Sequence, residues 1–297
     1  NNFPVAELRQ TLTPWSVFVP GFLCPSDSGP GKSKPLPNGN PNADANRPTP
    51  GRTNYVACVG DWAEATVFAV ANAQYEISRG FITTKQGTGN SSALVLPPTR
   101  SFSDLIDGTS NTVAFGEIAI AYDNEELART GTYVYTDTAK PLKYANIVSG
   151  NANQNKPRAC LDTVSQGKYS AATAIQAKGL FWGWGVPLFS SFSTVLPPNS
   201  PSCATGTAED VTAYATNAPN NNKNNNGNTW VVDRRVLNST ASWHPGGVNT
   251  LFGDGSVHFA NETVDTGSGT QIVLSGESPF GVWGALGSIN GGDNGSL

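Results

Sequence analysis

The apolar segments of this chain are short, and residues that favour turns separate them. Among the longest is GLFWGWGVPLF at 179–189, which is well below the roughly 18 residues that a membrane-spanning helix needs. The 297 residues include 32 Gly and 21 Pro, together with many Asn, Ser and Thr. This composition favours short strands joined by loops over long helices. We therefore expect an α+β, β-rich fold with long loops and a few short helices, and no membrane span.

Length and charge narrow the class of protein further. A chain of 297 residues can bury a large core, and we see no linker or internal repeat, so we predict a single domain over residues 1–297. Only 13% of residues are charged, the formal net charge is −4, and the 18 Lys and Arg are scattered. The sequence shows no basic patch that could contact a phosphate backbone, so nucleic acid is not an expected partner.

Four isolated cysteines predict disulfides. Cys24, Cys58, Cys160 and Cys203 show no CxxC spacing, which argues against a zinc ribbon or a thioredoxin-like pair. Two disulfides in an oxidising compartment fit this pattern, and sequence order makes Cys24 with Cys58 and Cys160 with Cys203 the simplest of three connectivities. Buried free thiols are the alternative.

Several segments have strand patterns. We predict strands over 53–61 and 66–78, a strand that enters Cys24, and a buried strand over 179–189 that places Trp182 and Trp184 on one face. Over 101–122, Ser103 is predicted to cap a short helix that ends at Gly108, and a core strand follows. The Pro-rich and Gly-rich run from 26 to 52 and the Asn-rich run from 217 to 228 are predicted loops.

The segment SWHPGGVNTLFGDGSVHF, residues 242–259, predicts a β-hairpin and holds the only two histidines. Asp254 and Gly255 form the dipeptide favoured in a two-residue type I′ turn. In that register Phe252 faces Val257 and Thr250 faces Phe259. These four side chains share an apolar face with Val248, and the opposite face carries Asn249, Leu251 and His258.

His244 precedes this hairpin and is followed by Pro245 and two glycines. Extended strands would separate it from Asp254 by more than roughly 10 Å, so we do not expect a catalytic His–Asp dyad. An imidazole that anchors a corner or a subunit contact is the favoured interpretation of the His244, Asp254 and Gly255 motif.

Five segments in order resemble the DUF1559 family: FLCPSD (22–27), NYVACVGD (54–61), FSDLIDGTSNTVAFGE (102–117), LPPNSPSC (196–203) and HPGGVNTLFGDG, which has the H-X9-DG pattern. Members of that family are similar to large type IV pilins and pseudopilins, with a leader, a long hydrophobic N-terminal helix and a β-rich extracellular head. The resemblance covers nearly the whole chain. It implies a pilin-like head dominated by antiparallel sheet, and we expect the N-terminal helix to be absent from this chain.

The resemblance and the residues together predict a non-enzymatic structural subunit of an extracellular filament, pilus-like fibre or cell-surface assembly, whose partners are copies of itself. The chain lacks HExxH, GxSxG and P-loop motifs, so we expect no catalytic residues. The alternative is an extracellular solute-binding or polysaccharide-binding protein, with Trp182 and Trp184 as an aromatic platform. No cofactor is required, although calcium at Asp107 and Asp254 is a further hypothesis, because related pseudopilins bind it.

Overall fold

The computed structural model describes residues 17–28, 51–61, 79–82, 100–120, 127–135, 157–169, 174–175, 178–179, 182–183, 187–205, 236–269, 273, 275–292 and 297. The predicted strand over 66–78 and the Asn-rich loop lie outside these residues, as do Trp184 and most of the predicted loop from 26 to 52. No helix in the described part of the chain is long and apolar enough to cross a membrane.

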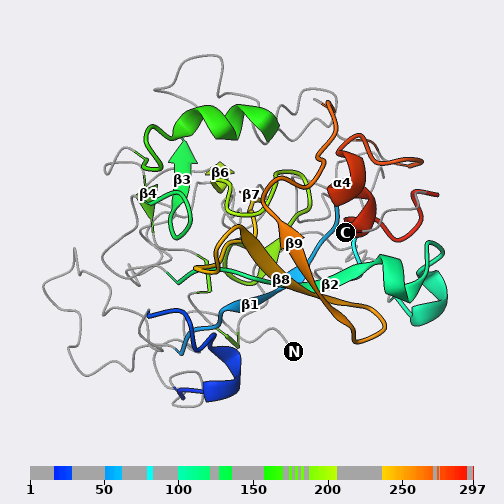
Figure 1. Cartoon of the computed structure of the whole chain (residues 1–297), viewed down its shortest axis with the longest axis horizontal. Coiled ribbons are helices and arrows are strands. Elements are labelled where there is room, and N and C mark those ends of the chain that lie inside the picture. The colour runs from blue at the N-terminus through cyan, green and yellow to red at the C-terminus, as the bar shows by residue number, and fades with distance from the viewer. Residues whose placement is uncertain are drawn as a thin grey trace, which may run out of the picture.

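Two sheets organise the described chain (Figure 1). The larger has five strands in the order β5-β1-β2-β8-β9, namely β5 Ser191–Phe192, β1 Tyr55–Cys58, β2 Val113–Glu117, β8 Gly247–Phe252 and β9 Val257–Asn261. The smaller has the order β4-β3-β6-β7, namely β4 Ala174–Ile175, β3 Thr132–Tyr135, β6 Cys203–Thr205 and β7 Val236–Leu237. Pairing is antiparallel except for β1 with β5 and β3 with β6. The α+β, β-rich prediction is confirmed at this level.

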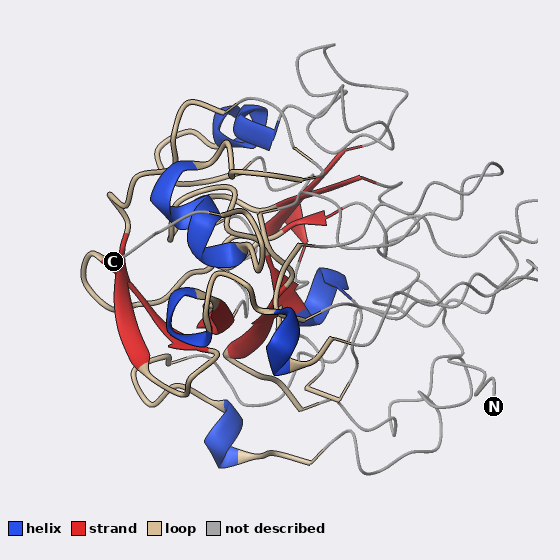
Figure 2. Cartoon of the chain, turned by 90° about the vertical axis from the view of Figure 1, so that its right-hand side faces the viewer, coloured by secondary structure: helices blue, strands red, loops and turns tan. Residues whose placement is uncertain are grey.

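The helices are short, and loops connect most of the strands (Figure 2). The described helices are α2 Pro187–Ser190, α4 Gly281–Gly287 and the 3-10 turns η2 Pro20–Phe22, η3 Phe102–Asp104, η4 Thr109–Asn111 and η7 Pro157–Thr163. From α4, Trp283 reaches full burial, stacks on Phe192 and donates from Nε1 to the Leu196 carbonyl at 2.9 Å. Helix α4 thereby closes the core against the larger sheet.

Each sheet has its own buried cluster. The core of the larger sheet contains Val56, Cys58, Val113, Ile118, Phe192, Val248, Phe252, Ala260, Trp283 and Leu286. The core beside the smaller sheet contains Ala128, Tyr133, Cys160, Tyr169, Val195, Leu196, Cys203, Leu237 and Phe280. The predicted strands over 53–61 and in 101–122 are confirmed as β1 and β2, because their apolar side chains fill the first of these clusters.

Three local predictions are wrong. The segment entering Cys24 contains η2 instead of a strand, since Pro20 starts a tight turn. The described parts of 179–189 are turns and α2 instead of a strand, because Gly179 has φ +63 and Pro187 starts a helical turn. The helix before Gly108 is only η3, and the Asp104 carboxylate accepts from the N–H of Ser101, which replaces Ser103 as the cap.

The cysteine prediction is half right. Cys160 and Cys203 form a disulfide across 43 residues, whereas Cys24 and Cys58 are both free and buried. The predicted second disulfide is therefore absent. Cys58 points into the core of the larger sheet, and burial raises its thiol pKa to about 12, which leaves it protonated and unreactive.

We predict that the protein, denatured without reductant, contains two titratable thiols and one disulfide. Two free thiols are expected because Cys24 and Cys58 are not bonded to each other. The Cys160–Cys203 disulfide restricts the conformations of the unfolded chain between these two residues. Breaking that bond in a Cys160→Ala, Cys203→Ala variant should lower the free energy of unfolding by about 4 kcal/mol. Thiol titration before and after reduction checks the count, and no free thiol in the monomer would contradict the assignment.

Candidate functional site

The hairpin register determines which side chains the larger sheet exposes. Strands β8 and β9 pair Leu251 with Val257, Thr250 with His258 and Asn249 with Phe259, one residue away from the predicted register. The loop contains three residues and is closed by a hydrogen bond from the Gly255 N–H to the Phe252 carbonyl. Gly255 has a positive φ of +89. The predicted two-residue turn at Asp254 and Gly255 is therefore wrong.

A one-residue shift moves every side chain of a strand to the other face. Val257 and Phe259, which were predicted to pack on the core, are instead 64% and 44% exposed. Val248, Thr250 and Ala260 fill the core side. The outward face of the hairpin is therefore apolar.

A bulge in β2 adds an aromatic ring to the same face. The register of β2 against β8 shifts between Val113 and Phe115, so Val113 is fully buried while Phe115, two residues on, is 37% exposed. Tyr55 on β1 is exposed to the same extent. Together β1, β2, β8 and β9 present a largely apolar surface, which we call the open face.

A groove with a volume of about 1160 Å³ lies over the open face. Its aromatic lining consists of Phe22, Tyr55, Phe81, Phe102, Phe115 and Trp182. Trp182 packs at 5.7 Å between ring centroids against Phe22, and its Nε1 donates to the Val17 carbonyl. Trp182, one half of the predicted aromatic platform, thus lines the groove, and Trp184 is outside the described residues.

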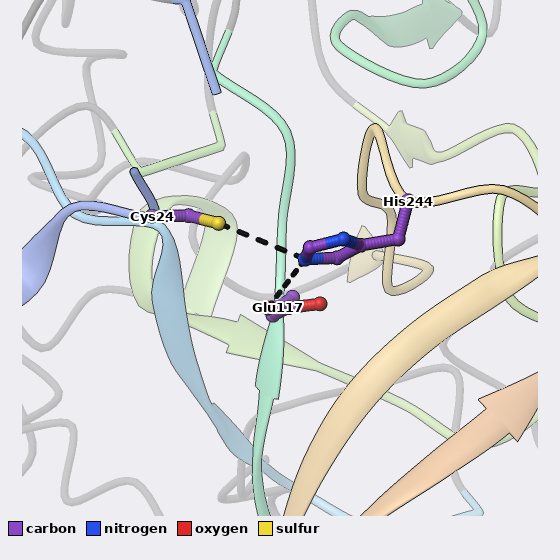
Figure 3. A group of neighbouring side chains, drawn as sticks. All are labelled: Cys24, Glu117 and His244. Carbon is purple, nitrogen blue, oxygen red and sulfur yellow. Dashed lines mark hydrogen bonds and ion pairs between the residues drawn. The ribbon is translucent and has the colours of Figure 1, made fainter. Parts of the chain in front are cut away.

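Three side chains meet at the end of the open face where β2 finishes (Figure 3). Cys24 follows η2, Glu117 is the last residue of β2, and His244 lies in the corner before β8. His244 Nε2 is 3.8 Å from Cys24 Sγ and 3.5 Å from Glu117 Oε1. Cys24 and Glu117 are buried, and the His244 side chain is 31% exposed. We call these three residues the corner cluster.

Hydrogen bonds hold the carboxylate and the imidazole of the corner cluster in place. Glu117 accepts from the Asn249 backbone N–H at 2.7 Å and from the Asn249 side-chain amide at 3.2 Å. The backbone N–H of His244 donates to Ser242 Oγ, which in turn donates to the Gly247 carbonyl. These bonds fix the bend between 242 and 247, so the imidazole points back at β2 and away from the hairpin turn.

Buried Asn54 holds the cysteine. Its Oδ1 accepts from the Cys24 backbone N–H at 2.9 Å, and its Nδ2 donates to the Ile118 carbonyl and to Asp27 Oδ2. Asp27 Oδ2 also accepts from the backbone N–H of Ile120. The loop that carries Cys24 is therefore attached to the chain directly after β2.

Two more side chains surround the cysteine sulfur. Ser26 Oγ lies 2.9 Å from Cys24 Sγ and 3.3 Å from His244 Nε2. Tyr55 pairs with Glu117 across β1 and β2. Burial, followed by the neighbouring Cys24 and Glu117, raises the pKa of the Tyr55 hydroxyl above its usual value. Tyr55 and Asn249 line the groove and also interact with residues of the corner cluster.

The other predicted site residues lie in turns. Asp254 accepts through Oδ1 from the N–H and the hydroxyl of Ser256. Asp107 accepts from the backbone N–H groups of Gly291 and Gly292. Neither belongs to a group of three potential metal ligands among the described residues, and calcium binding by Asp107 and Asp254 stays a prediction.

Sequence reasoning did not predict that Cys24, Glu117 and His244 would meet. They are separated by 93 and 127 positions, although each lies in one of the segments FLCPSD, FSDLIDGTSNTVAFGE and HPGGVNTLFGDG. The available signal was that each of these three segments contains a residue type that can ligate a metal or take part in catalysis.

The sequence model of a family described as "Protein of unknown function (DUF1559)" matches residues 2–267. No curated protein and no solved structure matches the chain.

We predict that Asn54→Ala lowers the free energy of unfolding by about 3 kcal/mol, because it leaves the Cys24 N–H and the Ile118 carbonyl buried without this partner. Asn261→Ala is the matched control: its exposed Oδ1 accepts from the Thr263 N–H and hydroxyl, and its loss should cost less than about 1 kcal/mol. Urea denaturation of both variants measures the difference. Equal losses would mean that Asn54 does not hold the loop.

Proposed function

The chain belongs to the DUF1559 family, and we propose that it is a non-enzymatic structural subunit of an extracellular filament or cell-surface assembly, built by contacts between copies of itself. The observation that carries the proposal is the open face. Tyr55 on β1, Phe115 on β2, and Val257 and Phe259 on β9 are between 37% and 64% exposed. Contiguous apolar surface of this kind is typical of protein interfaces.

The groove provides a shape for such an interface. A concave apolar surface on one side of a subunit can receive a protruding segment of the next copy, and a contact between two different surfaces repeats without closing. Phe102, which lines the groove, is 66% exposed, and Ile106, four residues further along the chain, is 75% exposed. Large exposed side chains of this kind gain free energy when a neighbouring copy covers them.

The disulfide supports the proposed location outside the cell. Cys160–Cys203 lies entirely within the core beside the smaller sheet. Disulfides of this structural type persist in oxidising compartments and are rare in the cytoplasm. A weakly charged surface, with 13% charged residues in the chain, also limits repulsion between copies.

The corner cluster supports the expectation that the protein is not an enzyme. In a thiol protease the nucleophile contacts one nitrogen of the imidazole, which takes its proton, and a third side chain orients the ring through the other nitrogen. Here Cys24 and Glu117 both approach Nε2. With both neighbours at the same nitrogen, the ring is not arranged as in a catalytic triad, where a second group at the other nitrogen orients the base that activates the nucleophile.

We predict concentration-dependent self-association in sedimentation velocity and polymers in electron micrographs of concentrated protein. Phe115→Ser should weaken association at least about 10-fold, which corresponds to about 1.4 kcal/mol. Because the contact is apolar, raising the salt concentration should not weaken it.

The control for that experiment is Leu161→Ser. Leu161 is 36% exposed like Phe115, but it lies in η7 and does not line the groove. It should associate as the unchanged protein does. A protein that stays monomeric at millimolar concentration would contradict the proposal. Equal self-association of Phe115→Ser and Leu161→Ser would also contradict it.

A second candidate function, binding of an extracellular polysaccharide, is favoured by one observation: Trp182 and Phe22 lie together in the groove. Aromatic rings in a groove are the usual platform for sugar rings. Calorimetry with neutral polysaccharides separates the two functions. Saturable binding that Trp182→Ala abolishes would support the second candidate. Without saturable binding, only the assembly function would remain.

A further inference from the structure

We propose that Cys24, Glu117 and His244 form a binding site for one zinc ion. Their ligand atoms, a sulfur, a carboxylate oxygen and an imidazole nitrogen, all lie within 4.8 Å of one another. This inference does not depend on the proposed assembly function, because it concerns the corner cluster and not the apolar groove.

Two of the three separations between the ligand atoms are close to those around a tetrahedral ion, and the third, from the sulfur to the carboxylate, is within 4.8 Å. Zinc bonds of about 2.3 Å to sulfur and about 2.0 Å to nitrogen and oxygen place neighbouring ligand atoms roughly 3.3 to 3.6 Å apart. The measured separations are 3.8 Å from Sγ to Nε2 and 3.5 Å from Nε2 to Oε1. The two pairs need to close by only a few tenths of an ångström around an ion.

The direction of the side chains distinguishes a metal site from a proton relay. Figure 3 shows the sulfur and the carboxylate reaching the same imidazole nitrogen from different elements. Convergence on one point is what ligands around a cation do. A neutral Nε2 can donate only one proton, so it cannot satisfy both neighbours fully, whereas a cation between the three atoms attracts all of them.

The donor types select the metal. A thiolate and an imidazole favour zinc, and calcium and magnesium prefer sets of oxygen ligands. Three protein ligands leave a fourth tetrahedral position. The exposed edge of His244 gives that position access to water, and Ser26 Oγ, 2.9 Å from Cys24 Sγ, lies beside it.

The surroundings already orient the ligands. Asn249 donates twice to Glu117, and Asn54 fixes the backbone of Cys24. Bonds of this kind to the groups that hold a metal are common in zinc sites and strengthen binding. Bound zinc would join three segments that are far apart in the sequence: the loop after η2, the end of β2 and the corner before β8.

The experiment uses the whole chain without an affinity tag, after dialysis against a chelator and a check of its folding. Calorimetry with zinc chloride should give one equivalent bound, and cobalt chloride should give a thiolate-to-cobalt charge-transfer band. Cys24→Ser and His244→Ala should weaken binding at least about 10-fold. His258→Ala, which removes the other histidine, should bind as the unchanged protein does.

Thiol reactivity provides a second readout. Zinc should protect Cys24, which is 9% exposed, from a thiol reagent in the native protein. Cys58 should stay unreactive in either state, because it is 0% exposed and burial raises its thiol pKa to about 12. Glu117→Gln keeps the shape of the side chain and one oxygen that can accept from the Asn249 backbone N–H, although it loses the bond from the Asn249 side-chain amide. It should lower zinc affinity and leave the circular dichroism spectrum unchanged.

The unchanged protein alone can overturn the proposal. A folded, chelator-treated chain that binds no stoichiometric zinc, or whose cobalt complex lacks the thiolate band, has no such site. Binding that is equal in Cys24→Ser, His244→Ala and the unchanged protein would place the metal elsewhere and would also refute it. Loss of self-association with zinc binding intact would refute only the assembly function.

Discussion

The register of β8 against its two neighbours determines most of the structure around the site. The three-residue loop at 253–255 pairs Thr250 with His258, and the bulge after Val113 aligns Phe115 with Leu251. Because alternate side chains face opposite sides of a sheet, these two irregularities decide which apolar residues are buried. They direct Val248, Thr250 and Phe252 to the core, and they leave Phe115, Val257 and Phe259 outside. The same β8 strand places the Asn249 amides against Glu117, so the open face and the corner cluster both depend on one pairing.

The four cysteines illustrate how the environment of a thiol decides its chemistry. Cys160 and Cys203 lie in the core beside the smaller sheet, where η7 and β6 bring them into bonding distance. Cys58 is fully buried in the core of the larger sheet, and this burial, together with the nearby Asp61 carboxylate, raises its thiol pKa and suppresses its ionisation. Cys24 is held by Asn54 and faces an imidazole, a carboxylate and a hydroxyl. One residue type therefore serves as a crosslink, a packing group and a potential ligand.

Sequence patterns identified the elements better than their partners. Strands β1 and β2 and the β8–β9 hairpin follow from β-branched and aromatic residues bounded by turn residues. The ranges predicted for β1 and β2 contain the observed strands but are longer, and the predicted hairpin segment ends within β9. The exact length of the turn was not predicted, because Gly253, Asp254 and Gly255 are compatible with a loop of two or three residues. Packing of the strands against the core determines which of the two forms. Cys24 was paired with Cys58 by sequence order, which contains no information about direction in space. Trp283 was missed as a core residue because a short helix with Gly281, Gly284 and Gly287 has low intrinsic propensity and forms through burial.

The open face combines two surfaces with different physical requirements. An apolar groove gains free energy when water is excluded from it, so its natural partner is another large surface and its affinity responds little to salt. The zinc site proposed at the corner cluster would gain free energy when a cation lies between the carboxylate, the imidazole and the sulfur, so it would respond to metal concentration. Tyr55 and Asn249 border both surfaces. A subunit covering the groove would therefore approach the exposed edge of His244, and metal binding at the corner would precede that contact, because a covered corner no longer admits an ion from solution.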